Sequence, residues 1–145
     1  MIPKQFRIHA VLIVACLFII IFPLLNEKPD IEKADKARLA AMAFLPLVDA
    51  GNYAESWQSA ATLMQERISQ AEWIETLTQT RTLTGDLVTR TEKSASYSTT
   101  AKDSPDGEYV LLIFDTKFQR AENVAEYVTV MLEDEHWRVA GYFIK

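Results

Sequence analysis

The sequence predicts an α+β domain in which about three helices pack on one face of a curved, four-stranded antiparallel sheet. Two observations support this fold class. Apolar residues recur with helical spacing up to Gly85, and from Leu87 onward they follow the period of two that is typical of strands. The four predicted strands are joined by connections that are too short for a crossover, so they must pair antiparallel. Helices followed by strands are the order expected of an α+β domain.

The first predicted helix runs from about Ile31 to Asp49. Pro46 lies inside it and should kink the helix or end it early. Gly51 is the natural stop, because glycine readily adopts the left-handed conformation that ends many helices. One apolar stripe supports the assignment, made of Ala37, Ala40, Ala41, Phe44, Leu47 and Val48.

Two capping patterns begin the next two helices. Asn52 and Glu55 form a pair like a capping box before a stripe that extends to Ile68. Ser69 and Glu72 form a second box before a third helix, which should end ahead of Gly85. The sequence therefore predicts one continuous helix after Asn52 and another after Ser69.

Four strands follow. They are predicted at residues 87–97, with a bulge near residues 94–96, and at 108–118, 124–133 and 137–144. Residues 104–107 (Ser-Pro-Asp-Gly) form a turn, and residues 134–136 make the tight link between the last two strands. Both faces of this sheet read as apolar, although the helices cover only one. The second face should be buried by another copy of the chain or by a partner, or else form an exposed patch with a role.

An apolar run precedes the domain. Residues 8–25 contain no acid, lysine or arginine and span about 27 Å as a helix, close to the thickness of a bilayer core. We expect an uncleaved, single-pass membrane anchor over residues 1–25, a linker over 26–35 and an exported domain over 36–145. Lys4 and Arg7 precede the run, which predicts a cytoplasmic N-terminus and a periplasmic domain at a bacterial inner membrane.

Two other interpretations of this run stay open. A cleaved signal peptide usually has a shorter apolar core and a small-x-small cleavage site, which the sequence lacks here. A lipoprotein signal would use Cys16, although the apolar run continues after that cysteine. The sequence does not decide whether Cys16 is lipidated or the N-terminus is removed.

Charge narrows the range of partners. The chain has 15 Lys and Arg against 20 Asp and Glu; without Lys4 and Arg7 the balance is 13 against 20, a net charge of −7. This balance argues against nucleic acid as a partner and against docking on anionic lipid, so residues 8–25 must supply the membrane attachment.

Several separated motifs resemble a known bacterial family. The opening one is Phe44-Leu45-x-Leu47-Val48-Asp49-Ala50-Gly51-x-Tyr53-x-x-Ser56-Trp57, and the closing one is Trp137-Arg138-Val139-Ala140-Gly141-Tyr142. Between them lie Trp73, Arg81, Gly85, Arg90, residues 105–109 (Pro-Asp-Gly-Glu-Tyr) and Asp115-Thr116-x-Phe118. Over residues 36–145 the chain resembles the domain of unknown function 4019 (DUF4019). The resemblance implies a cone similar to the NTF2-like (nuclear transport factor 2) or cystatin-like folds, and it implies no activity and no catalytic residues.

The sequence predicts no metal site and no cofactor. His136 is the only histidine after residue 25, no cysteine lies there, and the four glycines of the chain are not clustered into a phosphate loop. Asp115 is the one weak catalytic candidate, because it ends an apolar strand segment and proton-transfer chemistry in cone folds uses a carboxyl group in an apolar pocket. The structural alternative is that Asp115 pairs with Arg138 or Lys117, or faces water.

Four residues are weak candidates for ligand binding. Arg81 and Arg90 flank Gly85 and are suited to bind a carboxylate, although such arginines more often cap a helix or bridge Asp49, Glu72 or Asp115. Trp57 and Trp73 are suited to line a pocket, although aromatic residues at helical spacing are more often core.

The sequence does not assign an activity. The leading hypothesis is a non-enzymatic binding or envelope-assembly module, which pairs with a second copy or an envelope protein through a sheet face holding Leu111, Tyr127 and Tyr142. The alternative is a small-molecule binder, or a lyase- or isomerase-like enzyme, that uses the interior of the cone. A third interpretation, an accessory protein of envelope stress or immunity, has no residue in the sequence that tests it.

Overall fold

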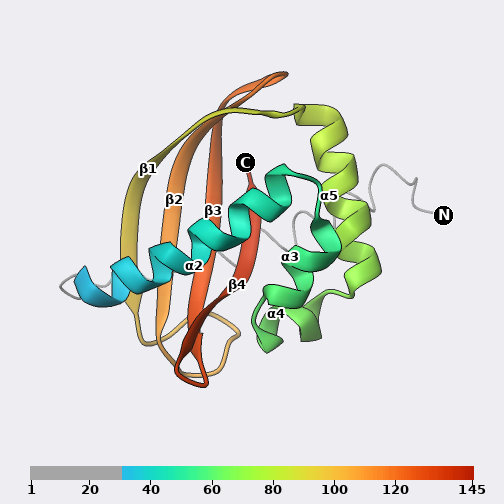
Figure 1. Ribbon diagram of the computed structural model, residues 1–145. Coiled ribbons are helices and arrows are strands. Elements are labelled where there is room, and N and C mark those ends of the chain that lie inside the picture. The colour runs from blue at the N-terminus through green and yellow to red at the C-terminus, as the bar shows by residue number, and fades with distance from the viewer. Residues whose placement is uncertain (1–30) are drawn as a thin grey trace.

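The computed structural model describes residues 31–145 and has the predicted α+β architecture. Four strands form one antiparallel sheet in the order β1-β2-β3-β4, with β1 at Leu87–Ser98, β2 at Tyr109–Phe118, β3 at Ala121–Glu133 and β4 at His136–Ile144. The helices are α2 (Ile31–Asp49), α3 (Tyr53–Ser59), α4 (Thr62–Arg67) and α5 (Gln70–Thr84). Figure 1 shows α2 crossing one face of the curved sheet, with α3, α4 and α5 grouped beside it.

Helix α2 matches its predicted bounds and continues through Pro46 to Asp49, so the proline does not end it early. Pro46 has no N–H to donate, so the carbonyl oxygen of Met42, four residues earlier, loses its helical hydrogen bond. Both Pro46 and Met42 are exposed. The chain then turns at Gly51, whose φ of +80° favours glycine.

The second predicted helix is in fact two helices. Ala60 and Ala61 are extended, and the backbone N–H of Ala61 donates a 2.8 Å hydrogen bond to the carbonyl oxygen of Val139 in β4. Docking of this link on the edge of β4 outweighs the local helical pattern. Asn52 precedes α3 but makes no side-chain capping bond, whereas the capping box of Ser69 and Glu72 is complete at the start of α5.

A bulge in β4 changes which residues face the helices. Thr129 pairs with Gly141 but Val130 pairs with Val139, which leaves Ala140 as an extra residue. Val139 and Tyr142 therefore both face the helices, although they are three residues apart. A similar register shift lies between Glu92 and Ser94 in β1, next to the predicted bulge.

The main core lies between the sheet and the helices. It includes Phe44 and Val48 of α2, Trp73 and Leu77 of α5, and sheet residues with little or no exposed surface: Val110, Leu112, Phe114, Val128, Val130, Val139 and Tyr142. A smaller cluster lies on the other side of the sheet, which we call the second face. It consists of Leu111, Ile113, Tyr127 and Phe143.

Residues 31–145 contain no helix that is long and apolar enough to cross a bilayer. The predicted anchor over residues 1–25 lies outside the described residues, as do Cys16 and the first half of the predicted linker, residues 26–30.

Candidate functional site

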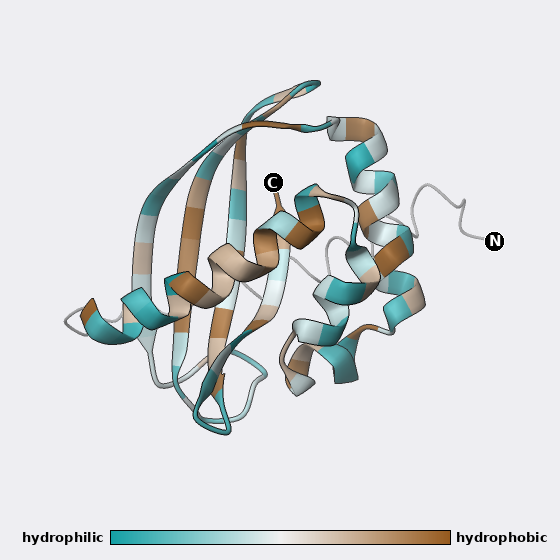
Figure 2. Ribbon diagram, viewed as in Figure 1, coloured by the Kyte–Doolittle hydropathy of each residue, from teal (hydrophilic) through white to brown (hydrophobic). Residues whose placement is uncertain are grey.

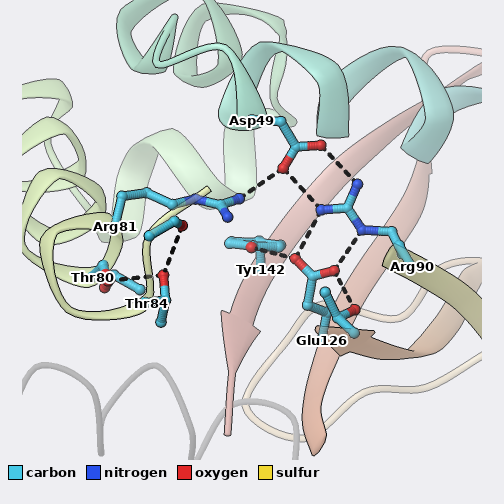
Figure 3. A network of polar contacts seen from close by, with 9 residues as sticks. Asp49, Thr80, Arg81, Thr84, Arg90, Glu126 and Tyr142 are labelled. Carbon is cyan, nitrogen blue, oxygen red and sulfur yellow. Dashed lines mark hydrogen bonds and ion pairs between the residues drawn. The ribbon is translucent and has the colours of Figure 1, made fainter. Parts of the chain in front are cut away.

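A network of charged side chains lies at the centre of the domain, where α2, α5 and the sheet meet (Figure 3). It joins Asp49 at the end of α2, Arg81 in α5, Arg90 in β1 and Glu126 in β3. Arg90 binds the two carboxylates on either side of it. Its Nη1 and Nη2 donate to Asp49 at 2.7 and 2.9 Å, and its Nε and Nη2 donate to Glu126.

The ends of two helices and the register of the strands bring these four groups together. Asp49 is the last residue of α2, and Arg81 is in the last turn of α5. Arg90 lies in register with Thr116 of β2, which is next to Glu126 across the sheet. Two acids and two arginines meet there, so their formal charges sum to zero.

Glu126 has no exposed surface, and its carboxylate is saturated with donors. Besides the two bonds from Arg90, it accepts a 2.7 Å hydrogen bond from the hydroxyl of Thr116 and a 2.6 Å hydrogen bond from that of Tyr142. A carboxylate offers about four acceptor positions. A general base needs a free one within reach of the substrate, so Glu126 serves as a structural counter-ion.

Both arginines bind carboxylates of the network, Arg90 more fully than Arg81. Arg81 donates a 2.8 Å hydrogen bond to Asp49, and its guanidinium lies over the ring of Phe118, 4.5 Å from the centroid. Its buried Nη1 makes no hydrogen bond, and the ring face of Phe118 is the electron-rich group beside that guanidinium. Burial alone would lower the pKa of Arg90, but its hydrogen bonds to Asp49 and Glu126 outweigh burial and raise it.

Aromatic side chains fill the space beside the network. The rings of Phe44, Trp73 and Tyr142 lie 6.2 Å apart, centroid to centroid, in every pairing. The indole N–H of Trp73 donates to the hydroxyl of buried Ser56 at 3.0 Å. Burial and the nearby charge of Glu126 raise the pKa of Tyr142 well above its usual value, so its hydroxyl stays protonated and donates.

The weak catalytic candidate, Asp115, lies away from this network. Its side chain is 63% exposed, and its ion-pair contact is with Lys93 at 3.5 Å. The predicted alternatives Arg138 and Lys117 pair instead with Glu133 and Glu122. Asp115 thus pairs at the surface with Lys93, whereas Arg81 and Arg90 bind Asp49 in the charged network.

Among the ligand-binding candidates, the structure brings Arg81 and Arg90 together through Asp49 and places Trp73 in the core. Trp57 is partly buried against that core, and its indole N–H donates to the carbonyl oxygen of Ile68 at 2.9 Å. A shallow depression of about 340 Å³ lies elsewhere on the helical side, lined by residues 51–55 and Ile74. None of these four candidates lines it.

The predicted interface residues divide between the two faces of the sheet. Leu111 and Tyr127 lie on the second face, but Tyr142 lies under the helices, which corrects the predicted grouping. The bulge at Ala140 is the cause, because it shifts the alternation of β4 by one residue. Phe143 takes the place of Tyr142 on the second face and stacks on Tyr127 with ring centroids 4.5 Å apart.

The sequence analysis did not select Glu126. The signal was available, because Glu126 alternates with the buried residues Val128 and Val130. An acid on a buried face requires a partner, and the structure supplies Arg90 from β1, two strands away. His136 is exposed, and within residues 31–145 no group of three or more His, Cys, Asp or Glu side chains is placed to hold a metal ion.

Comparison with known proteins adds the family. No curated protein and no solved structure matches the chain. The model of one protein family, described as "Protein of unknown function (DUF4019)", matches residues 40–142, which include every member of the charged network. The chain therefore belongs to the DUF4019 family.

Proposed function

We propose that the chain is a membrane-anchored periplasmic protein whose domain is a non-enzymatic binding or envelope-assembly module. The observation that carries the proposal is the filled interior of the domain. Trp73 and Phe114 are 4% and 1% exposed, and the charges of Asp49, Arg81, Arg90 and Glu126 neutralise one another. A cone that acts on a small molecule needs an enclosed space with polar groups that are free to bind it.

The anchor in this proposal is the apolar run over residues 8–25, with an N-terminal transmembrane helix leading into the NTF2-like or cystatin-like cone. Its length of about 27 Å as a helix suits a bilayer core, and the cations before it favour a cytoplasmic N-terminus at a bacterial inner membrane. The domain would then lie in the periplasm. The net charge of −7 in the rest of the chain is consistent with a protein partner and unfavourable for nucleic acid.

The second face of the sheet is the proposed recognition surface. Tyr127 and Ile113 keep part of their surface exposed there, whereas Leu111 and Phe143 keep only 6% and 4%. Tyr127 is therefore the residue through which contact with a second copy or an envelope protein is best probed. Aromatic side chains of this kind are enriched at protein interfaces.

The test is photo-crosslinking in intact membranes. A photo-reactive phenylalanine analogue replaces Tyr127 in one variant and the exposed Gln58 of α3, on the helical side, in a matched control. The proposal expects one discrete product from position 127, either a dimer of the chain or a complex with one envelope protein, that is absent from position 58. Equal, diffuse labelling from both positions would contradict it.

A further inference from the structure

Helix α2 carries an apolar stripe on the side that faces away from the sheet. Leu39 and Met42 are 72% and 43% exposed, and exposed Ala43 and Pro46 continue the stripe at the i, i+3, i+4, i+7 spacing of one helix face. Ile31, at the start of the helix, is 71% exposed. Figure 2 shows hydrophobic segments along α2, which lies in front of the sheet with its outer side uncovered.

Between Ile31 and Leu39 the same outer side carries charged residues, which are paired within the helix. Glu32 accepts a 2.8 Å bond from Lys36, and Asp35 forms an ion pair with Arg38. Arg38 also binds Glu92 of β1 through Nε and Nη2, which holds the first half of α2 against the sheet. The outer side of α2 therefore combines exposed apolar groups with charges that have local counter-ions.

Helix α2 is also the element next to the proposed anchor. Six residue steps separate Leu25, the end of the apolar run, from Ile31, and an extended chain covers at most about 20 Å in that distance. The stripe from Leu39 to Pro46 extends about 10 Å along the helix, and Ile31 lies about 12 Å before it. Given the proposed anchor, the start of α2 cannot leave the neighbourhood of the bilayer surface.

We infer that the outer face of α2 docks on the lipid bilayer, with Ile31, Leu39 and Met42 inserted at the level of the headgroups. This inference rests on the proposed anchor and adds an orientation to it. Apolar insertion needs no anionic lipid, which fits a domain whose net charge is negative. Tethering raises the effective concentration of the surface next to the bilayer, so three side chains suffice where a free domain would not bind.

Docking on lipid also fits the arrangement of the sheet. The second face lies on the opposite side of the sheet from α2 and would point away from the bilayer. The stripe would hold the domain in one orientation, and Tyr127 would be presented to partners in the periplasm.

The test uses the full chain in phosphatidylcholine vesicles with and without brominated acyl chains, which quench nearby fluorophores. A Cys16→Ser background carries one cysteine with an environment-sensitive label, at Ala43→Cys on the stripe or at Lys93→Cys on β1. The Lys93 side chain is 63% exposed and contacts Asp115 on the other side of the sheet. Bromine should quench the label at position 43 and leave the label at position 93 unchanged.

Matched leucine variants test the stripe itself. Leu39→Gln with Met42→Gln should lower the ratio of docked to undocked label at position 43 roughly tenfold, because two apolar side chains no longer insert. Leu83→Gln should have no effect, since Leu83 is 73% exposed, like Leu39, but belongs to α5.

Three outcomes distinguish failure of the docking of α2 from failure of the proposed anchor on which it rests. A third label, at Phe18→Cys, reports the anchor. Quenching at position 18 without quenching at 43 would overturn the docking of α2 and leave the anchor intact, whereas no quenching at position 18 would overturn both. Disulfide-linked dimers of the unlabelled Ala43→Cys variant, without lipid quenching, would assign the stripe to a second copy and also overturn the inference.

Discussion

Glu126 is a fully buried carboxylate in the middle of an apolar strand, and its environment explains why it is tolerated. Removing an ion from water costs several kcal/mol unless close opposite charges and hydrogen bonds compensate. Arg90, Thr116 and Tyr142 together supply four donors. The residue therefore fixes the relative positions of three strands, β1, β2 and β4, around its own.

Glu126→Gln should destabilise residues 31–145 by roughly 3–5 kcal/mol, because it leaves the buried guanidinium of Arg90 sharing Asp49 with Arg81. Urea unfolding measures the change. The double variant Glu126→Gln with Arg90→Met restores a balanced pair of Asp49 and Arg81, and it should recover at least half of the loss. A double variant that is less stable than Glu126→Gln alone would contradict this account of the network.

The raised pKa of Tyr142 predicts that the stability of the domain falls at alkaline pH. Its folded-state pKa is raised by burial and by the charge of Glu126, so its contribution to stability is complete below about pH 10, the usual tyrosine value, and is lost as the pH rises toward the folded value. One raised group costs at most about 1.4 kcal/mol per pH unit in that range. Urea midpoints at pH 9, 10 and 11 should therefore fall less steeply for Tyr142→Phe than for the unaltered chain. Parallel slopes would mean that Tyr142 does not titrate with unfolding.

At the scale of elements, helix ends show which local signals govern the fold. The Ser69–Glu72 box forms with both of its hydrogen bonds. The hydroxyl and the backbone N–H of Ser69 both donate to the Glu72 carboxylate and lower its pKa. Asn52 has an equally suitable residue type but makes no side-chain bond to α3. The backbone N–H of Asn52 instead donates to the carbonyl oxygen of Leu47 in the turn that ends α2. A capping residue type thus marks a helix start without guaranteeing the cap.

Ser69, which caps α5, and Asn52, which makes no capping bond, give a matched pair of variants. Ser69→Ala should lower the free energy of unfolding by about 1 kcal/mol, the usual value for a lost N-cap. Asn52→Ala should change it by only a few tenths of that amount, since no capping bond is lost. Thermal or urea unfolding of both variants checks the difference. Equal losses would show that the side-chain bond of Ser69 is not the source of its effect.

The elements also show how much of the fold can be predicted from the sequence. Hydrophobic periodicity predicted the bounds of α2 and all four strands closely, because the burial of each stripe depends on local spacing alone. The break between α3 and α4 was missed, because it depends on a hydrogen bond from Ala61 to Val139 in a distant strand. The face of Tyr142 was missed for a similar reason, since one extra residue at Ala140 reverses the alternation after it.

At the scale of the candidate site, residue types were predictable and pairings were not. Arg81 and Arg90 stood out as a pair near Gly85, and Asp49 was among their expected partners. They meet on Asp49, and the further pairing of Arg90 with Glu126 depends on strand register, which no local pattern contains. Asp115 was equally notable in sequence, but its position in the strand points it toward solvent and Lys93.

For the whole molecule, the filled interior and the exposed stripe of α2 have one consequence. Under the proposed function, a domain whose internal charges neutralise one another would act through its surface, and an apolar run within about 20 Å of α2 would keep that surface at a membrane. In this proposal the domain is held in one orientation, with its helical layer toward the bilayer, and binds partners through its surface.

Native mass spectrometry of the full chain, released gently from membranes, tests this central claim most directly. The account predicts the mass of a chain that retains residues 1–25, with no small molecule bound in stoichiometric amount. A ligand mass that is lost on unfolding would contradict the filled interior and favour a pocket. A chain that lacks its first residues, whether cleaved or lipidated at Cys16, would contradict the uncleaved anchor.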